Sequence, residues 1–157
     1  MSRELDHKTE DALRENRASL VRIARQYAGP DDWQDLLQEI SVALWRGLPS
    51  FSGRAKRSTW VYRVAVNTAL QFVRRRRLPT TGLDTEPVGT LDAGDPMSVL
   101  ESFLRELDPV NRAVLLLDLE GLHRDEIGSV LGISGGAVAV RITRLKQRFT
   151  ERYVEAE

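Results

Sequence analysis

The chain has 157 residues, of which 41% are hydrophobic and 29% charged, and it contains no cysteine. This composition is typical of a soluble globular protein and excludes disulfides and thiolate metal sites, and the two distant histidines suggest no metal centre. Because the first residues form no apolar signal segment and no apolar run approaches the ~20 residues of a membrane span, a cytoplasmic protein without direct membrane association is expected.

Helices are predicted throughout the first 77 residues. Residues 15–29 place apolar side chains at helical spacing, and the pair Gly29-Pro30 ends the predicted helix. A second helix follows two aspartates that can cap it and ends at Gly47. A third opens at Ser58 or Thr59 and runs into four arginines, until Pro79 prevents it from continuing. The expected buried positions are Leu20, Ile23, Ala24 and Tyr27, then Trp33, Leu36, Leu37, Ile40 and Leu44, then Val61, Val64, Ala65, Thr68 and Phe72.

Residues 78–95 are rich in Gly, Pro, Thr and Asp and have no periodicity, which indicates a flexible acidic linker. The expected fold is all-α, with one small helical domain at residues 1–77 and a second at residues 96–157. In the second domain Pro96 begins a short helix and Asp108 caps the next one, ahead of two more helices.

Charge is distributed unevenly over these segments, although the 23 basic and 23 acidic residues cancel in total. Residues 1–77 hold 15 basic and 9 acidic side chains, and residues 78–95 hold no basic and 4 acidic ones. Residues 96–157 hold 8 basic and 10 acidic ones. The asymmetry favours a polyanionic partner, and a solvated basic face is the alternative explanation.

The last two helices have a helix-turn-helix pattern, which places a helix in the major groove of DNA. Gly128 is small where two helices cross closely, and Gly132 stands where the turn needs an unusual backbone conformation. On the final helix a buried stripe runs beside a second stripe that suits phosphate and guanine contacts. The buried stripe is Val138, Ile142, Leu145 and Phe149. The second is Ala137, Arg141, Arg144 and Arg148, preceded by the cap Ser134 and by Gly135 and Gly136, which let a phosphate approach the helix N-terminus.

One face of the third helix suits single-stranded or melting DNA. Aromatic rings stack on bases, arginines follow the phosphates, and amides read base edges. Packing alone would be the simpler explanation for the tryptophan, but its neighbours favour a function. The face consists of Trp60, Arg63, Asn67, Gln71 and Arg74, and the preceding loop adds Phe51, Arg54, Lys56 and Arg57.

The exposed face of the second helix carries Asp35, Gln38, Glu39 and Arg46. Polar faces of this kind are usually solvated, and the residues alone indicate no partner for it. No catalytic set, metal-ligand spacing or phosphate-binding loop is present, so no cofactor and no enzymatic activity are expected.

Three stretches together resemble the bacterial RNA polymerase sigma factors of the small, extracytoplasmic-function group. They are DDWQDLLQEISVALWR, FSGRAKRSTWVYRVAVNTALQFVRRRR and LDPVNRAVLLLDLEGLHRDEIGSVLGISGGAVAVRITRLKQRF. The resemblance implies that the polar face of the second helix binds the clamp helices of the largest polymerase subunit, and that the flap of the second-largest subunit is a further contact. It implies that the loop and third helix capture and melt the minus-ten element, and that the final helix reads the minus-thirty-five element.

The resemblance also implies roles for the charged segments and for a regulator. The four arginines would lie against the phosphates of the melted strand, and the acidic linker would occupy a channel built for nucleic acid. An anti-sigma protein is a further partner that the resemblance alone implies.

Three positions depart from the family pattern. Val66 and Ala139 stand where a basic residue is usual, which puts the strength of promoter contacts in question. His123 replaces the usual Ser or Thr at a helix N-cap, which weakens the cap by about 1 kcal/mol unless the imidazole takes over the hydrogen bond.

Two other functions remain open from the residues. A one-component helix-turn-helix regulator would bind duplex DNA stably without polymerase. A protein that only titrates a partner would make no DNA contact at all.

Overall fold

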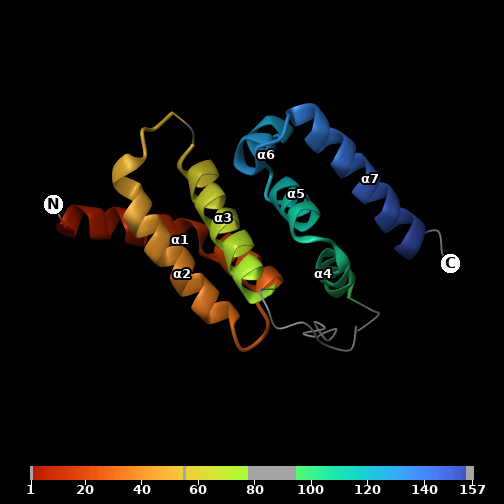
Figure 1. The fold of residues 1–157 in the computed structure, drawn as a ribbon, viewed down its shortest axis with the longest axis horizontal. Coiled ribbons are helices and arrows are strands. Elements are labelled where there is room, and N and C mark those ends of the chain that lie inside the picture. The colour runs from red at the N-terminus through yellow and green to blue at the C-terminus, as the bar shows by residue number, and fades with distance from the viewer. Residues whose placement is uncertain (1, 55, 78–94, 155–157) are drawn as a thin grey trace. The chain divides into compact units, whose positions relative to one another are not determined.

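The computed structural model describes residues 2–54, 56–77 and 95–154, and every regular element in these ranges is helical. The chain divides into two compact units, residues 1–88 and 89–157. The expectation of an all-α protein with two helical units is therefore confirmed, while most of the proposed linker, residues 78–94, lies outside the described residues. The elements are α1 (Ser2–Tyr27), α2 (Trp33–Gly47), the short 3-10 helix η1 (Leu48–Ser50), α3 (Arg57–Arg77), α4 (Pro96–Glu106), α5 (Pro109–Leu119), α6 (Arg124–Leu131) and α7 (Gly135–Tyr153) (Figure 1).

In the first unit α1, α2 and α3 each pack against the other two (Figure 1). The predicted stripes are buried at most positions, whereas Trp33, Leu37, Val64 and Thr68 are only half-buried. The buried face of α3 is wider than predicted, because helices on two sides cover more of its circumference than one partner could. The buried residues of α3 are Val61, Tyr62, Ala65, Val66, Ala69 and Phe72, with Thr59 at its start.

Helix α1 begins at Ser2, thirteen residues before the stretch that the sequence marks as helical. Its first half buries the polar side chain of Thr9, and Asn16, just past the midpoint, is buried as well. Both side chains donate hydrogen bonds to backbone carbonyls four residues earlier. Across the unit, the indole nitrogen of Trp45 donates to the carboxylate of Asp6 at 3.0 Å. Because these contacts are polar, no apolar period in the sequence marks this half of the helix.

In the second unit α7 packs on α5 and α6, and α4 packs on α5. The fully buried side chains include Phe103, Val114, Leu117, Ile127 and Val138. An aromatic cluster joins α4 to the last turns of α7: the Phe103 ring meets Phe149 edge-on at 5.3 Å and Tyr153 at 6.2 Å between centroids. Edge-to-face pairs of this kind add to the area that the rings bury.

Arg112 of α5 caps the C-terminal end of α4. Its guanidinium donates to the carbonyl oxygens of Leu104, Arg105 and Leu107 at 2.9, 3.0 and 3.0 Å. The last carbonyls of a helix have no partner within the helix, so a neighbouring cation that binds three of them stabilises the joint. This joint places the first turn of α5 beside α7.

Candidate nucleic-acid interface

The turn between α6 and α7 depends on two glycines, as the sequence predicts. A Cβ atom on Gly128 would collide with the carbonyl oxygen of Ile133, so the two helices cross where no side chain fits. Gly132 has φ +75°, the left-handed conformation that glycine adopts without strain. The backbone N–H groups of Gly132 and Ile133 both donate to the Gly128 carbonyl, at 2.7 and 3.0 Å. These bonds hold α6 and α7 at 105° to one another.

The same pair of helices is the one arrangement in the described ranges with the length and apolar composition of a membrane span. The 105° bend interrupts it, and no single described helix is long and apolar enough to cross a membrane.

His123 caps α6 in place of the usual hydroxyl residue. Its Nδ1 atom accepts a hydrogen bond from the backbone N–H of Asp125 at 3.2 Å, and the Glu126 carboxylate accepts one from the His123 N–H at 3.2 Å. This reciprocal arrangement is a capping box built on an imidazole. The weaker cap expected for a histidine therefore does not arise, because the ring supplies the acceptor.

The arginine stripe of α7 lines a surface groove of about 550 Å³. Sequence reasoning placed four of the lining residues on this stripe and Leu145 on the buried one, and it missed Asn111 and Val140. Val140 lies three residues after Ala137 and four before Arg144, so a complete helical wheel would have placed it beside the stripe. Asn111 comes from α5, and no helical period connects it with α7. Val140 is 48% exposed. The groove is lined by Asn111, Ala137, Val140, Arg141, Arg144, Leu145 and Arg148. It combines three cations with an apolar floor, which suits the phosphates, base edges and thymine methyl groups of a DNA groove.

The N-terminus of α7 differs in one respect from the prediction. Ser134 caps it as expected, accepting from the backbone N–H of Ala137 at 3.1 Å. A Cβ atom on Gly135, however, would collide with the Asp125 carboxylate, so the first glycine makes room for α6. Gly136 has open space around it, with only Ser134 Oγ at 4.0 Å from its Cβ position. Only the second glycine therefore leaves an open approach for a phosphate.

The predicted face of α3 is on the surface, and its tryptophan is also part of the packing. Asn67, Gln71 and Arg74 are exposed, as are Arg54 and Lys56 in the loop. Phe51, Arg57, Trp60 and Arg63 are half-buried. The rings of Phe51 and Trp60 have centroids 5.3 Å apart and a tilt of 40°. Trp60 also lies over Gly47, whose Cβ position is 3.1 Å from the indole. The indole is thus supported from α2 while part of it remains accessible.

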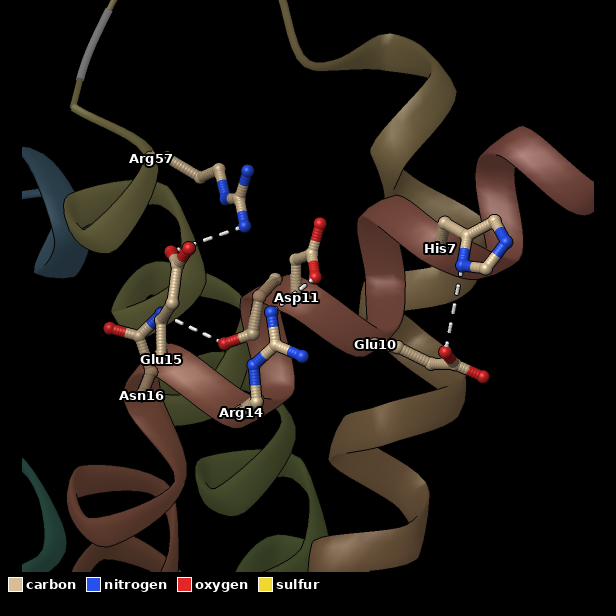
Figure 2. A network of polar contacts seen from close by, with 8 residues as sticks. His7, Glu10, Asp11, Arg14, Glu15, Asn16 and Arg57 are labelled. Atoms are coloured by element: carbon tan, nitrogen blue, oxygen red, sulfur yellow. Dashed lines mark hydrogen bonds and ion pairs between the residues drawn. The ribbon is translucent and has the colours of Figure 1, made fainter.

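Arg57 connects the loop to α1 rather than pointing freely to solvent. Its guanidinium donates to the Glu15 carboxylate at 3.2 Å, and Figure 2 shows the side chain reaching from the start of α3 toward α1. The Nε atom of Arg57 is buried without a hydrogen-bond partner in the described residues. A phosphate that contacted Arg57 would compete with Glu15.

Two of the four terminal arginines of α3 form ion pairs with carboxylates at and before α2, so a DNA phosphate that contacted them would compete with these carboxylates. Arg75 donates to Glu39 at 2.7 Å and Arg76 to Asp32 at 2.6 Å. Asp32 is consequently not a side-chain cap of α2, although it precedes the helix. Arg74 is exposed and retains the role proposed for it.

The contact with Arg76 shifts the titration of Asp32. The hydrogen bond from the guanidinium lowers the pKa of the Asp32 carboxyl below its usual value, against a smaller opposing effect of burial. The same bond raises the pKa of Arg76. A carboxyl whose pKa is lowered by folding stabilises the folded state above its unfolded-state pKa, and this contribution is lost as pH falls through the folded-state value.

Arg76→Gln is therefore expected to reduce the stability of the first unit by about 0.2–1 kcal/mol near neutral pH, as for other exposed pairs. The difference from wild type should shrink as pH falls from the ordinary aspartate range through the lowered pKa of Asp32, where the carboxylate loses its charge. Thermal unfolding of both proteins between pH 7 and pH 3 measures it, with Arg74→Gln as the control. A difference that is the same at both ends of the range would contradict the assignment to Asp32.

The α2 face carries the four predicted polar residues and two apolar ones that sequence reasoning missed. Asp35, Gln38 and Arg46 are exposed, and Glu39 is half-buried beside Arg75. The missed residues are Val42 and Trp45, each 43% exposed. Because Val42 lies four residues from both Gln38 and Arg46, a complete helical wheel of α2 would have placed it on this face.

The two positions that lack the usual basic residue differ in location. Val66 is fully buried, so a charged side chain would have to enter the core of the first unit. Because Val66 faces the core, the sequence-based concern about promoter contacts does not apply to this side chain as it is placed here. Ala139 is half-buried on α7.

Comparison with known proteins matches residues 12–78 to Sigma-70 region 2 and residues 98–149 to Sigma-70, region 4. The ECF RNA polymerase sigma-E factor of Escherichia coli K12 is 29% identical over 147 residues, which cover 82% of this chain and 77% of that protein. The protein of the same name from Haemophilus influenzae is 28% identical over 144 residues, which cover 80% of this chain and 76% of that protein.

Two solved structures have the same fold. CnrH, in complex with the cytosolic domain of CnrY, matches with a TM-score of 0.71 at 23% identity, over 97% of this chain and 90% of that chain. The sigma factor RpoE from Bartonella quintana, in complex with the anti-sigma factor NepR, matches with a TM-score of 0.67 at 20% identity, over 90% of this chain and 96% of that chain. With both sigma-70 regions matched in order along one chain, the protein belongs to the extracytoplasmic-function group of RNA polymerase sigma factors, which direct promoter-specific initiation of transcription.

Proposed function

We propose that the protein binds core RNA polymerase through the exposed face of α2 and directs it to a promoter with two separate elements. The observation that carries the proposal is the presence of two cationic helix faces in different units of one chain, on α3 and on α7. In this role residues 1–77 bind polymerase and the minus-ten element, residues 78–95 form the linker, and residues 96–157 bind the minus-thirty-five element.

The two DNA faces carry different residue types, so we expect each to bind DNA in a different state. The α3 face places Trp60 and two exposed amides beside cations, a combination that suits unpaired bases. The α7 groove follows a helix-turn-helix, which suits the major groove of a closed duplex. The protein in this role catalyses no reaction itself and acts in the cytoplasm, where it lends promoter specificity to the polymerase.

Run-off transcription on genomic fragments of the source organism tests the proposal. Core polymerase with the protein is expected to give discrete promoter-dependent transcripts, whereas core polymerase alone gives none of them. A one-component regulator would instead retard duplex DNA without core polymerase. A protein that only titrates a partner would change neither DNA mobility nor transcription, and either result would overturn the proposal.

Replacing both Asp35 and Glu39 by alanine is expected to weaken binding of core polymerase by about 1–2 kcal/mol, or roughly five- to thirtyfold, as for contacts at the centre of an interface. Because Glu39 also binds Arg75 at 2.7 Å, its loss frees a cation as well. Arg75→Gln is the matched control, since it breaks the same ion pair and keeps both carboxylates. Titration of labelled core polymerase with each variant measures the affinity. Equal affinity for the double variant and wild type would remove this face from the interface.

An anti-sigma partner is a second element of the proposal. CnrH and RpoE, which share the fold, are each solved in complex with another protein, and the partner of RpoE is an anti-sigma factor. We expect a protein of that kind to inhibit run-off transcription directed by this chain, and excess sigma factor to restore it.

A further inference from the structure

Asn111 lies in the first turn of α5, where its side chain is held by the residue that caps the helix. The Asp108 carboxylate accepts a hydrogen bond from the Asn111 backbone N–H at 3.2 Å and another from the side-chain Nδ2 at 2.6 Å. An amide has donors on its nitrogen and acceptors on its oxygen. Because the nitrogen must face the carboxylate, the amide oxygen of Asn111 is directed away from Asp108.

The oxygen of that amide faces α7 and accepts a hydrogen bond from Arg141. The distance between Asn111 Oδ1 and Arg141 Nη1 is 2.8 Å, and both side chains are half-buried. A chain of hydrogen bonds therefore runs from Asp108 through Asn111 to the guanidinium. Only one of the five N–H donors of the guanidinium is used in this bond, so the others can face a ligand in the groove.

Arg141 differs in this respect from the other two arginines of the groove. Arg144 and Arg148 are exposed, and no hydrogen bond or ion pair holds either side chain within the described part of the chain. An arginine that is already oriented loses less side-chain freedom when it binds, and its planar donor pattern meets the ligand in one direction. Orientation matters most where a bidentate contact to one base is made.

We infer that Asn111 is a positioning residue for Arg141, and that it thereby sets the base preference at one position of the minus-thirty-five element. The inference rests on the proposed function and assigns Asn111, which lines the same groove, a role that it performs through Arg141. Asn111 orients the guanidinium through its oxygen, and Asp108 orients Asn111. Arg144 and Arg148 contribute affinity without such an orientation.

The test compares the base preferences of four holoenzymes, each assembled from core polymerase and full-length protein. They contain wild type, Asn111→Ala, Arg141→Ala and the double variant. Each is used to select duplexes from a library that is randomised at the upstream element. Asn111→Ala is expected to lose preference at the one position where Arg141→Ala loses it, and to keep the preferences at the other positions. On the selected wild-type duplex its affinity should fall about three- to tenfold, the usual net size of one ordinary hydrogen bond.

The double variant separates positioning from a general structural effect. If Asn111 acts through Arg141, adding Asn111→Ala to Arg141→Ala changes neither the preference nor the affinity further. Val110→Ala is the matched control, because Val110 is the preceding residue of α5 and is 38% exposed. Thermal unfolding of each variant shows whether the second unit remains folded.

Two affinity results would overturn the inference. One is that Asn111→Ala lowers the affinity equally for every duplex. The other is that Asn111→Ala lowers the affinity as much in the Arg141→Ala background as it does in wild type. A wild-type holoenzyme that selects no sequence at all would contradict the proposed function itself. Retention of every base preference by a folded Asn111→Ala holoenzyme would contradict the positioning role alone.

Discussion

Gly128→Ala is expected to destabilise the second unit by about 3 kcal/mol, at the upper end of overpacking effects. The added methyl group would collide with the backbone carbonyl of Ile133 and lie 3.3 Å from the backbone nitrogen of Gly135. Backbone atoms cannot rotate away as a side chain can, so α6 and α7 must separate. Their separation would also strain the two hydrogen bonds that the Gly128 carbonyl accepts from the turn. Thermal unfolding followed by circular dichroism measures the loss.

Binding of the minus-thirty-five duplex should be lost in parallel, because the α7 groove depends on this helix crossing. Gly136→Ala is the matched control: the space around its Cβ position is open, and alanine favours the helix, so stability should be unchanged or slightly increased. If that variant nevertheless binds the duplex more weakly, a close approach of phosphate to Gly136 is supported. Stability of Gly128→Ala within about 0.5 kcal/mol of wild type would show that the crossing relaxes without strain.

Trp60→Ala is expected to impair promoter opening far more than promoter binding. Stacking of one base on an aromatic ring is worth ~1–3 kcal/mol, or roughly five- to 150-fold in the open complex. The second unit still holds the closed duplex, so recruitment should persist. Permanganate footprinting of the minus-ten region measures opening, and a template with a pre-melted bubble should restore part of the activity because the strands are already separated.

The experiment must distinguish stacking from packing, because the Trp60 ring also packs on Phe51 and over Gly47. Removing a half-buried ring should lower the free energy of unfolding by less than the ~3–5 kcal/mol lost with a fully buried ring, so the variant is expected to remain folded. Trp45→Ala is the matched control: it removes an exposed tryptophan from α2 and should affect core binding instead of opening. Parallel loss of stability, duplex binding and opening in Trp60→Ala would identify the residue as packing only.

The sequence by itself determined the features that depend on neighbouring residues. The helical period and the Gly-Pro and Asp-Pro signals predicted an all-α chain, and the glycines at 128 and 132 predicted the helix-turn-helix. The arginine stripe of α7 was also predictable, since residues three and four apart share a helix face whatever surrounds them. The order of the motifs along the chain was sufficient for the resemblance to sigma factors.

The tertiary structure alone decided which partners these side chains have. It directs Arg75 and Arg76 to α2, buries Val66, and brings Asn111 within 2.8 Å of Arg141, thirty residues away. A helical wheel gives the direction of a side chain but not the neighbouring helix that it meets. Those neighbours depend on how whole helices cross, which is set by packing summed over many residues distant in sequence. The free charges of the interface therefore became distinguishable from the paired ones only after the helices were placed.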